Sequence, residues 1–294
     1  MLKEGKVGFC GVRGNIDGRN VDLLAGVVVN PYWFGNLDLR DPNRPFMVPI
    51  FNVAWPGCNL RCGFCAIRMI SRPDFNQPHW IEMSPLQLVR LAGKVGTGRI
   101  LLTSEPSIHP ESVIEICKSA HKYQLQVYLY TNGYSNPEIA RILAEHVDGV
   151  ICGLKGSLNK AQYAKLGVET QGIKETIQVY GKYAREFMIS NMVGPSVPTT
   201  DQDDRELGRW ILEDVGNIPM EVGMESAPFP NDVTRLAGPV RFLPNLTVAE
   251  RSAHRVERNL RSQGLTRIAL RKYDRSIRNT PETNFWLRRQ WFSA

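Results

Sequence analysis

Three cysteines lie within eight positions of the chain, in the segment WPGCNLRCGFC at residues 55–65. Cys58, Cys62 and Cys65 share one glycine-containing loop, and this spacing favours metal ligation over disulfide pairing. A structural zinc site needs four nitrogen or sulfur ligands, usually from two paired motifs, and the sequence has no second CxxC. His79 could supply a fourth zinc ligand, but a single histidine in a loop is weak evidence for one.

An iron–sulfur centre is the alternative that these three thiols fit better. A [4Fe–4S] cluster is usually held by four cysteines, so three would leave one iron open. An open metal position can bind and activate a ligand. The cysteines also follow a strand-like segment directly, and the carboxyl ends of parallel strands form the site of α/β folds. Their number and position therefore indicate a catalytic centre.

The other three cysteines stand singly. Cys117 lies in a helical pattern and Cys152 in an apolar strand-like run, so we expect both to pack in the core. Cys10 is expected to be structural as well.

The elements that must position the loop alternate between strand-like and helix-like segments, which predicts βα units around a parallel sheet. Ser84-Pro85 reads as an N-cap followed by proline at the first helical position. Six strands with five connecting helices fit an open doubly wound sheet or an incomplete barrel, and periodicity does not choose between them. The expected strands are 47–55, 99–104, 126–132, 149–155, 187–193 and 219–226, and the expected helices 84–92, 110–122, 137–146, 171–185 and 202–215, with a last helix at 247–263 and a short strand at 266–273.

Length and composition predict one main domain. We expect an irregular or hairpin extension at residues 1–46, the α/β unit at 47–245, and a C-terminal helix and basic tail at 246–294. No apolar run reaches the ~18 residues of a membrane span, and the N-terminus lacks a secretory pattern, so we expect a soluble, cytoplasmic protein.

The net charge of +7 is concentrated at the C-terminal end. From Arg251 to Ala294 eleven Lys or Arg stand against three acidic residues, so this segment carries +8 and the rest of the chain −1. Such a tail would attract nucleic acid, an acidic protein or a phosphorylated ligand, and a solvated basic surface explains it equally well.

The pattern Cys58-x3-Cys62-x2-Cys65, with Phe64 before the last cysteine, resembles the signature of the radical S-adenosylmethionine (radical SAM) superfamily. The resemblance implies a partial (β/α)6 TIM-like barrel, with a [4Fe–4S] cluster and SAM as cofactors. In that family the open iron binds SAM, and an electron cleaves SAM to a 5′-deoxyadenosyl radical that abstracts a hydrogen atom from the substrate. It also implies an electron donor such as flavodoxin or ferredoxin.

Several strand ends resemble the segments that bind SAM in that family. Thr103-Ser104-Glu105-Pro106 is similar to a Gly-Gly-Glu-Pro-like segment that receives the SAM amino group, which implies contacts from Ser104 and Glu105. Glu105 could instead begin a turn before the next helix. Asn132, in Thr-Asn-Gly, is similar to an element near the SAM ribose, although Asn-Gly also suits a plain turn.

Further resemblance lies in the later strands. Gly153-Leu154-Lys155 stands where the pyruvate formate-lyase activating branch usually reads Asp-Leu-Lys, so Lys155 would pair with the SAM carboxylate, or remain solvated, while the aspartate is absent. Asn191 is a candidate ribose contact. Where relatives often place a histidine, the sixth strand offers Glu221 and Glu225, so we expect a different substrate pocket.

The segment GKVGFCGVRGN at residues 5–15 and SEPSI at 104–108 are similar to the AmmeMemoRadiSam group, relatives of the pyruvate formate-lyase activating enzymes. That group usually carries further cysteines ahead of the barrel, of which only Cys10 is present here. We therefore expect no second metal site in the N-terminal extension. The expected function is hydrogen abstraction from an unidentified anionic or macromolecular substrate, by a glycyl-radical activase-like or modifying enzyme. The alternative is a non-catalytic, zinc-binding module for nucleic acid or protein.

Overall fold

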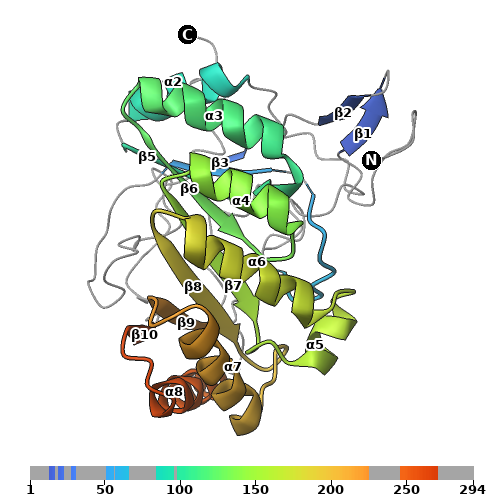
Figure 1. The fold of residues 1–294 in the computed structure, drawn as a ribbon, viewed down its shortest axis with the longest axis vertical. Helices are drawn as coiled ribbons and strands as arrows, with labels where there is room; N and C mark the ends of the chain where they lie inside the picture. Colours follow the sequence, from blue (N-terminus) through green and yellow to red (C-terminus); the bar gives the residue numbers. More distant parts are fainter. Residues whose placement is uncertain are drawn as a thin grey trace.

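The computed structural model describes residues 13–16, 19–22, 28–30, 51–55, 57–65, 84–95, 98–224 and 246–270. Its main sheet (Figure 1) contains β3 (Val28–Asn30), β4 (Phe51–Ala54), β5 (Arg99–Thr103), β6 (Gln126–Thr131), β7 (Gly149–Lys155), β8 (Phe187–Val193), β9 (Met220–Met224) and β10 (Ile268–Leu270). A separate antiparallel hairpin joins β1 (Arg13–Ile16) to β2 (Arg19–Asp22).

The strand order is β10-β9-β8-β7-β6-β5-β4-β3, so strands that follow one another in the chain are neighbours in the sheet. All pairings from β4 to β10 are parallel, and β3 is antiparallel to β4. β3 and β10 form opposite edges, so the sheet is open. This is the predicted partial TIM-like architecture. The segment near residue 268, expected only as a short strand, adds a seventh parallel strand.

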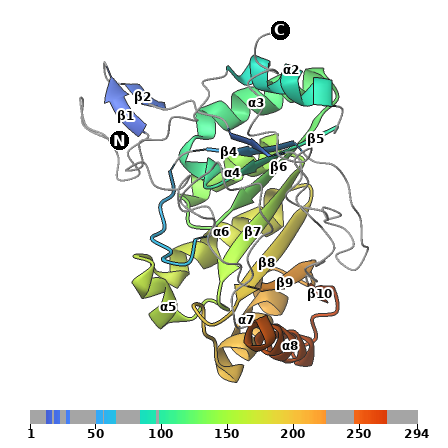
Figure 2. The same ribbon diagram turned by 180° about the vertical axis from the view of Figure 1, so that it is seen from behind.

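Helices cover one face of the sheet. They are α2 (Pro85–Val95), α3 (Pro110–Lys122), α4 (Pro137–His146), α5 (Lys160–Lys165), α6 (Thr170–Tyr183), α7 (Asp201–Asp214) and α8 (Leu246–Ser262), with a 3₁₀ turn, η1 (Pro106–Ile108). In Figure 1 helices α3, α4 and α6 lie in front of the strands, and in Figure 2 they lie behind them. Helices on one face are typical of a barrel wall, whereas a doubly wound sheet carries them on both.

Caps explain where the helices begin. The N–H of Gln87 donates to Ser84 Oγ at 3.2 Å and Ser84 N–H donates to Gln87 Oε1 at 2.8 Å, which is a capping box at the predicted start of α2. Thr200 and Asp203 form a second capping box at the start of α7. All the predicted helices are confirmed within a few residues. The short helix α5 was not expected.

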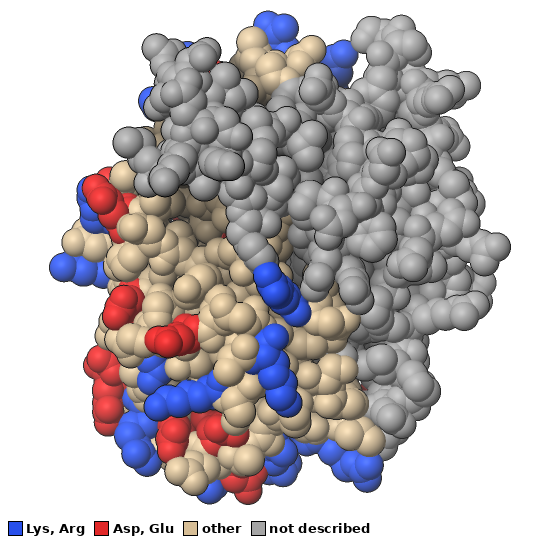
Figure 3. Space-filling view, turned by 90° about the vertical axis from the view of Figure 1, so that its right-hand side faces the viewer, with Lys and Arg blue, Asp and Glu red and all other residues tan. Residues whose placement is uncertain are grey.

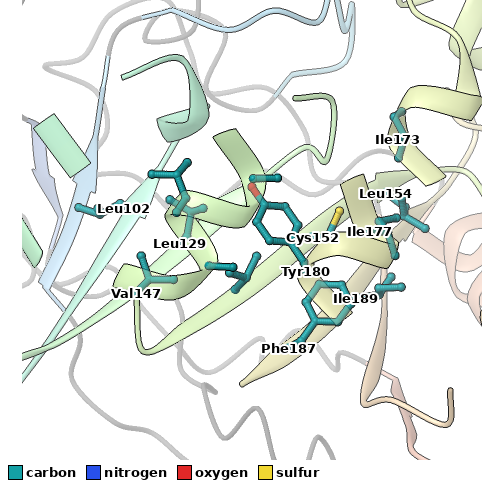
Figure 4. Packing of buried hydrophobic residues seen from close by; sticks show 14 of the residues in the cluster. Leu102, Leu129, Val147, Cys152, Leu154, Ile173, Ile177, Tyr180, Phe187 and Ile189 are labelled. Atoms are coloured by element: carbon teal, nitrogen blue, oxygen red, sulfur yellow. The ribbon is translucent and has the colours of Figure 1, made fainter. Parts of the chain in front are cut away.

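The main core lies between the sheet and its helices. Leu102, Leu129 and Cys152, from three neighbouring strands, share one buried cluster with Ile177 and Tyr180 of α6 (Figure 4). Cys117 belongs to the same cluster, so the prediction that Cys117 and Cys152 pack in the core is confirmed.

The opposite face of the sheet carries a second buried cluster, formed by Leu101, Tyr128, Ile151 and Met188, with Tyr130 packed against it. Side chains alternate between the two faces of a strand. Gly153 and Lys155 therefore lie on the same face as Ile151, and Ser190 on the same face as Met188. We call this face, which carries none of the helices in the described part of the chain, the inner face.

Described surface residues carry charges of both signs. On the face drawn in Figure 3, Lys and Arg side chains are interspersed with Asp and Glu. None of the described helices has the length and apolar character needed to cross a bilayer. Most of the basic segment lies beyond residue 270, outside the described residues. The proposed domain boundaries stay predictions.

A buried carboxylate fastens α8 to the body of the fold. Asp204, fully buried on α7, accepts hydrogen bonds from Ser157 Oγ at 2.7 Å, Arg255 Nε at 3.3 Å and Asn259 Nδ2 at 3.2 Å. These donors come from the loop after β7 and from α8. The buried charge is compensated by a cation and two neutral donors, so removing it takes one acceptor from each of these three groups.

We expect Asp204→Ala to lower the free energy of unfolding by about 3 kcal/mol, because Arg255 and two polar groups lose a buried partner. Asp201→Ala is the matched control: Asp201 contacts the same arginine at 3.5 Å but is 57% exposed, and its loss should cost about 1 kcal/mol or less. Urea unfolding of both variants measures the difference. Equal effects would contradict the assignment of Asp204 as the anchor of α8.

Candidate functional site

The three cysteines lie in the loop that leaves the carboxyl end of β4. Cys62 is buried, and Cys58 and Cys65 are half-buried. Two contacts fix the path of the loop: Trp55 N–H donates to the carbonyl of Thr103 at 3.3 Å, and Arg61 N–H donates to the carbonyl of Leu166 at 3.2 Å. The loop is therefore attached to the end of β5 on one side and to the end of α5 on the other, next to which it runs in Figure 2.

The other two thiols of the loop act on Cys58. Burial, the charge of Glu105 and the neighbouring Cys65 and Cys62 together raise the pKa of the Cys58 thiol to about 12, although the Leu60 N–H acts in the opposite direction. Without a cation the thiol therefore keeps its proton, and a bound metal would have to displace it. Across the described residues, no three His, Cys, Asp or Glu side chains are grouped to hold a single metal ion.

Glu105 connects the end of β5 to the end of β6. Its carboxylate is fully buried; Oε1 accepts from Ser107 Oγ at 2.5 Å and Thr131 Oγ1 at 2.7 Å, and Oε2 accepts from Asn132 N–H at 2.7 Å. Burial raises the pKa of Glu105, while these donors act in the opposite direction. Since both oxygens are occupied, the carboxylate holds the two strand ends together.

Ser104 occupies the position of a glycine in the segment that it resembles. Its φ of 75° lies in the left-handed region, which favours glycine. Its Oγ is buried and makes no hydrogen bond in the structure. A buried polar atom without a partner at the end of β5 is a position where a ligand can supply the missing hydrogen bond.

Asn132 reaches the cysteine loop from the end of β6. Its Nδ2 lies 3.5 Å from Cys58 Sγ and 2.7 Å from Asn59 Oδ1. Its Oδ1 accepts from Tyr134 N–H at 2.8 Å. The structure therefore brings Asn132 to the predicted metal ligands.

Lys155 is the last residue of β7 and lies on the inner face. It interacts electrostatically with the sulfur atoms of Cys58 and Cys62 in the cysteine loop. Burial lowers the pKa of Lys155, but the Tyr130 phenol and the sulfurs of Cys62, Cys152 and Cys58 outweigh it, so the pKa is raised. The ammonium is therefore charged, and Nζ donates to the carbonyl of Gly153 at 2.6 Å. It provides a fixed positive charge beside the cysteine loop.

The side chain of Tyr130 explains why residue 153 is a glycine and not the aspartate of the Asp-Leu-Lys segment that it resembles. A Cβ on Gly153 would lie 2.8 Å from Tyr130 Cε1, 2.9 Å from its hydroxyl oxygen and 3.1 Å from Lys155 Nζ. The phenol and the ammonium therefore fill the space that an aspartate would need. Sequence reasoning missed Tyr130, although its place two residues before Asn132 puts it on the same face of the strand.

Asn191 lies away from this cluster. It lies on the same face of β8 as Ile189 and Val193, which belong to the helix-side core. Its Oδ1 accepts from Ser157 N–H at 3.2 Å and its Nδ2 donates to Ser157 Oγ at 3.0 Å. Asn191 thus holds the turn after Lys155, where Ser157 and Leu158 have positive φ. The predicted ribose contact stays a prediction.

The remaining predicted residues are placed as follows. Phe64 is half-buried and packs against the main core. Glu221 is buried on the inner face, where its Oε1 accepts from Ser190 Oγ at 3.2 Å. Cys10, His79 and Glu225 lie outside the described residues.

Comparison with known proteins shows the family of this chain. The profile of the Radical SAM superfamily matches residues 52–209, more than half of the chain. An uncharacterized protein of Methanocaldococcus jannaschii is 24% identical over 222 residues, covering 74% of this chain and 64% of that protein. A probable GTP 3′,8-cyclase of Thermococcus kodakarensis is 30% identical over 131 residues, 41% of each chain. The chain thus spans less than two thirds of the length of either relative.

Among solved structures, SuiB of Streptococcus suis bound to S-adenosylmethionine superposes with a TM-score of 0.54 at 14% identity, covering 74% of this chain and 49% of SuiB. SuiB bound to its precursor peptide SuiA gives the same TM-score and covers 48% of SuiB. At 14% identity, the similarity to SuiB shows the fold alone.

We expect Gly153→Ala to destabilise the protein by about 1–3 kcal/mol, because the new methyl group overlaps the Tyr130 ring. Gly93→Ala on α2 is the control, since nothing lies within 4 Å of its added Cβ. In a Tyr130→Ser background the Gly153→Ala cost should largely disappear. A double-mutant cycle by urea unfolding tests this, and an unchanged cost in that background would rule out the overlap as its cause.

Proposed function

Because this chain belongs to the radical SAM superfamily, we propose that Cys58, Cys62 and Cys65 hold a [4Fe–4S] cluster whose fourth iron binds SAM. Such a cluster supplies the electron that cleaves SAM to a 5′-deoxyadenosyl radical, which abstracts a hydrogen atom from the substrate. The donor set supports the proposal: three thiols lie in one loop, close enough for Cys62 and Cys65 to raise the pKa of Cys58.

The observation that carries the proposal is the meeting of several strand ends at this loop. Asn132 contacts Cys58 Sγ, and Glu105 and Lys155 both interact electrostatically with the Cys58 sulfur. These are the ends of β5, β6 and β7, where an α/β barrel builds its site. The three cysteines thus lie beside Glu105, Asn132 and Lys155, three of the side chains expected around SAM, whereas Asn191 contacts Ser157 instead.

We assign the SAM contacts from these positions. Ser104 Oγ, which is buried without a partner, would bond the SAM amino group together with nearby main-chain carbonyls. Glu105 acts indirectly, because its oxygens are already occupied and hold the strand ends in place. Lys155 would pair with the SAM carboxylate as a fixed cation. Phe64 would shield the loop between the second and third cysteines.

The branch of the superfamily, the electron donor and the substrate class are proposed from the sequence. We place the chain near the AmmeMemoRadiSam and pyruvate formate-lyase activating branch, on the Ser104–Ile108 and Gly153–Lys155 segments. An electron donor such as flavodoxin or ferredoxin reduces the cluster, and a reducing cytoplasm keeps the thiols free. SAM is consumed as an oxidant or also donates a methyl group, and analysis of its products separates these two outcomes. The C-terminal excess of positive charge favours an anionic or macromolecular substrate.

Anaerobically reconstituted protein should be brown, bind about four irons, and release 5′-deoxyadenosine from SAM under a strong reductant. Cys62→Ala should lose both the iron and SAM cleavage, whereas Cys117→Ala, which removes a core thiol on α3, should keep them. Iron and sulfide analysis and chromatography of the nucleoside products measure this. A colourless wild-type protein with one zinc, or a Cys62→Ala protein that still cleaves SAM, would exclude the proposal.

Lys155→Met should weaken SAM binding by about 10- to 150-fold, because a charge-assisted hydrogen bond contributes about 1.5–3 kcal/mol. Lys160→Met on α5 removes an exposed lysine nearby and should leave the affinity unchanged. Equilibrium dialysis of the reconstituted proteins with labelled SAM compares them. If both variants bind SAM like the wild type, Lys155 does not contact the carboxylate.

A further inference from the structure

The side-chain amide of Asn132 is fixed in a single orientation. Tyr134 N–H donates to Asn132 Oδ1 at 2.8 Å, and Asn59 Nδ2 donates to the carbonyl of Tyr134 at 2.6 Å. A backbone N–H is always a donor and a backbone carbonyl always an acceptor. Both amides are therefore oriented by the main chain of Tyr134, and the oxygen and nitrogen of Asn132 cannot exchange places without losing these bonds.

In this orientation the amine group of Asn132 has two acceptors. Nδ2 lies 2.7 Å from Asn59 Oδ1 and 3.5 Å from Cys58 Sγ, a distance within the range of hydrogen bonds to sulfur. An amide nitrogen has two hydrogens, so these two acceptors use both. No hydrogen is left for a ribose oxygen.

The backbone of Asn132 is fixed as well. Its N–H donates to Glu105 Oε2 at 2.7 Å, and the residue is 5% exposed. The amide that faces the sulfur is thus held at the end of β6 by two hydrogen bonds: its side-chain oxygen accepts from Tyr134 N–H, and the backbone N–H of Asn132 donates to the buried carboxylate. A donor held in this way loses little conformational entropy when a charged sulfur forms beside it.

We propose that Asn132 is a positioning residue that donates a hydrogen bond to the Cys58 ligand and raises the reduction potential of the cluster. The inference rests on the proposed function, because it requires a cluster on the three thiolates. Reduction adds negative charge, part of which resides on the sulfur ligands, and a hydrogen-bond donor stabilises that charge. For Asn132, this hydrogen bond to the Cys58 ligand takes the place of the contact with the SAM ribose that was predicted from the sequence.

The test is the midpoint potential of the reconstituted holoenzyme, followed by electron paramagnetic resonance during a reductive titration. Asn132→Ala removes the donor without adding charge, and Asn132→Asp keeps the acceptor for Tyr134 N–H but places an oxygen beside the sulfur. We expect both to lower the equilibrium constant for reduction, by about tenfold for Asn132→Ala, which is 59 mV for one electron, and by more for Asn132→Asp.

The matched control is Asn136→Asp. Asn136 is the exposed N-cap of α4, and its side chain accepts from Glu138 N–H at 2.8 Å, which an aspartate can also do. This variant adds the same charge four residues away, where solvent screens it, so its potential should match the wild type.

The outcomes separate the two claims. Wild-type protein that takes up no cluster would overturn the proposed function. A cluster-loaded Asn132→Ala protein with the wild-type potential would overturn the role of Asn132 and leave the proposed function standing. Equal shifts in Asn132→Asp and Asn136→Asp would also overturn it, because the effect would then be one of charge alone.

Discussion

The carboxylate of Glu105 is buried at the point where β5 and β6 end, and the arrangement of the site depends on it. A buried charge is stable only where hydrogen bonds compensate for lost hydration. Here those bonds come from Ser107, Thr131 and the main chain of Asn132. The same interaction that satisfies the charge therefore fixes Asn132, and Asn132 in turn contacts the cysteine loop.

The alternation of side chains along parallel strands decides which residues can meet. Gly153 pairs with Ser190, and Ser190 with Glu221, so these residues form a row on the inner face. Neighbouring strands lie about 4.8 Å apart, which places Glu221 about 10 Å from Gly153. The inner face thus carries Lys155 and Glu221, whereas the side chain of Asn191 belongs to the helix side.

The sequence predicted the parts of the site that depend on local spacing. The proposed ligands follow from three cysteines in one loop, because their number and distance along the chain decide what they can bind. The helix start at Ser84 was predicted from local capping, whereas the capping box at Thr200 was not, and the helix there was expected from residue 202. Glu105 was located correctly at a strand end. Ser107 is a local partner, but Thr131 and Asn132 come from the end of β6 and could not be read from neighbouring residues.

The rest depended on the register of the sheet. β8 reads FMISNMV and is buried on both faces, so its apolar pattern does not show to which side Asn191 points. Tyr130 was missed for the same reason: only the pairing of β6 with β7 shows that its ring fills the space beside Gly153. The helix α5 follows a turn in which Gly156, Ser157 and Leu158 all have positive φ. The glycine marks a turn, but serine and leucine do not indicate that this conformation continues.

A [4Fe–4S] cluster on the three thiolates would leave one iron open for SAM. Mössbauer spectra of protein reconstituted anaerobically with ⁵⁷Fe, recorded before and after addition of SAM, test it most directly. The account predicts a four-iron cluster in which the signal of one iron shifts when SAM binds while the other three stay unchanged. Spectra that are identical with and without SAM, or a metal centre without inorganic sulfide, would contradict it.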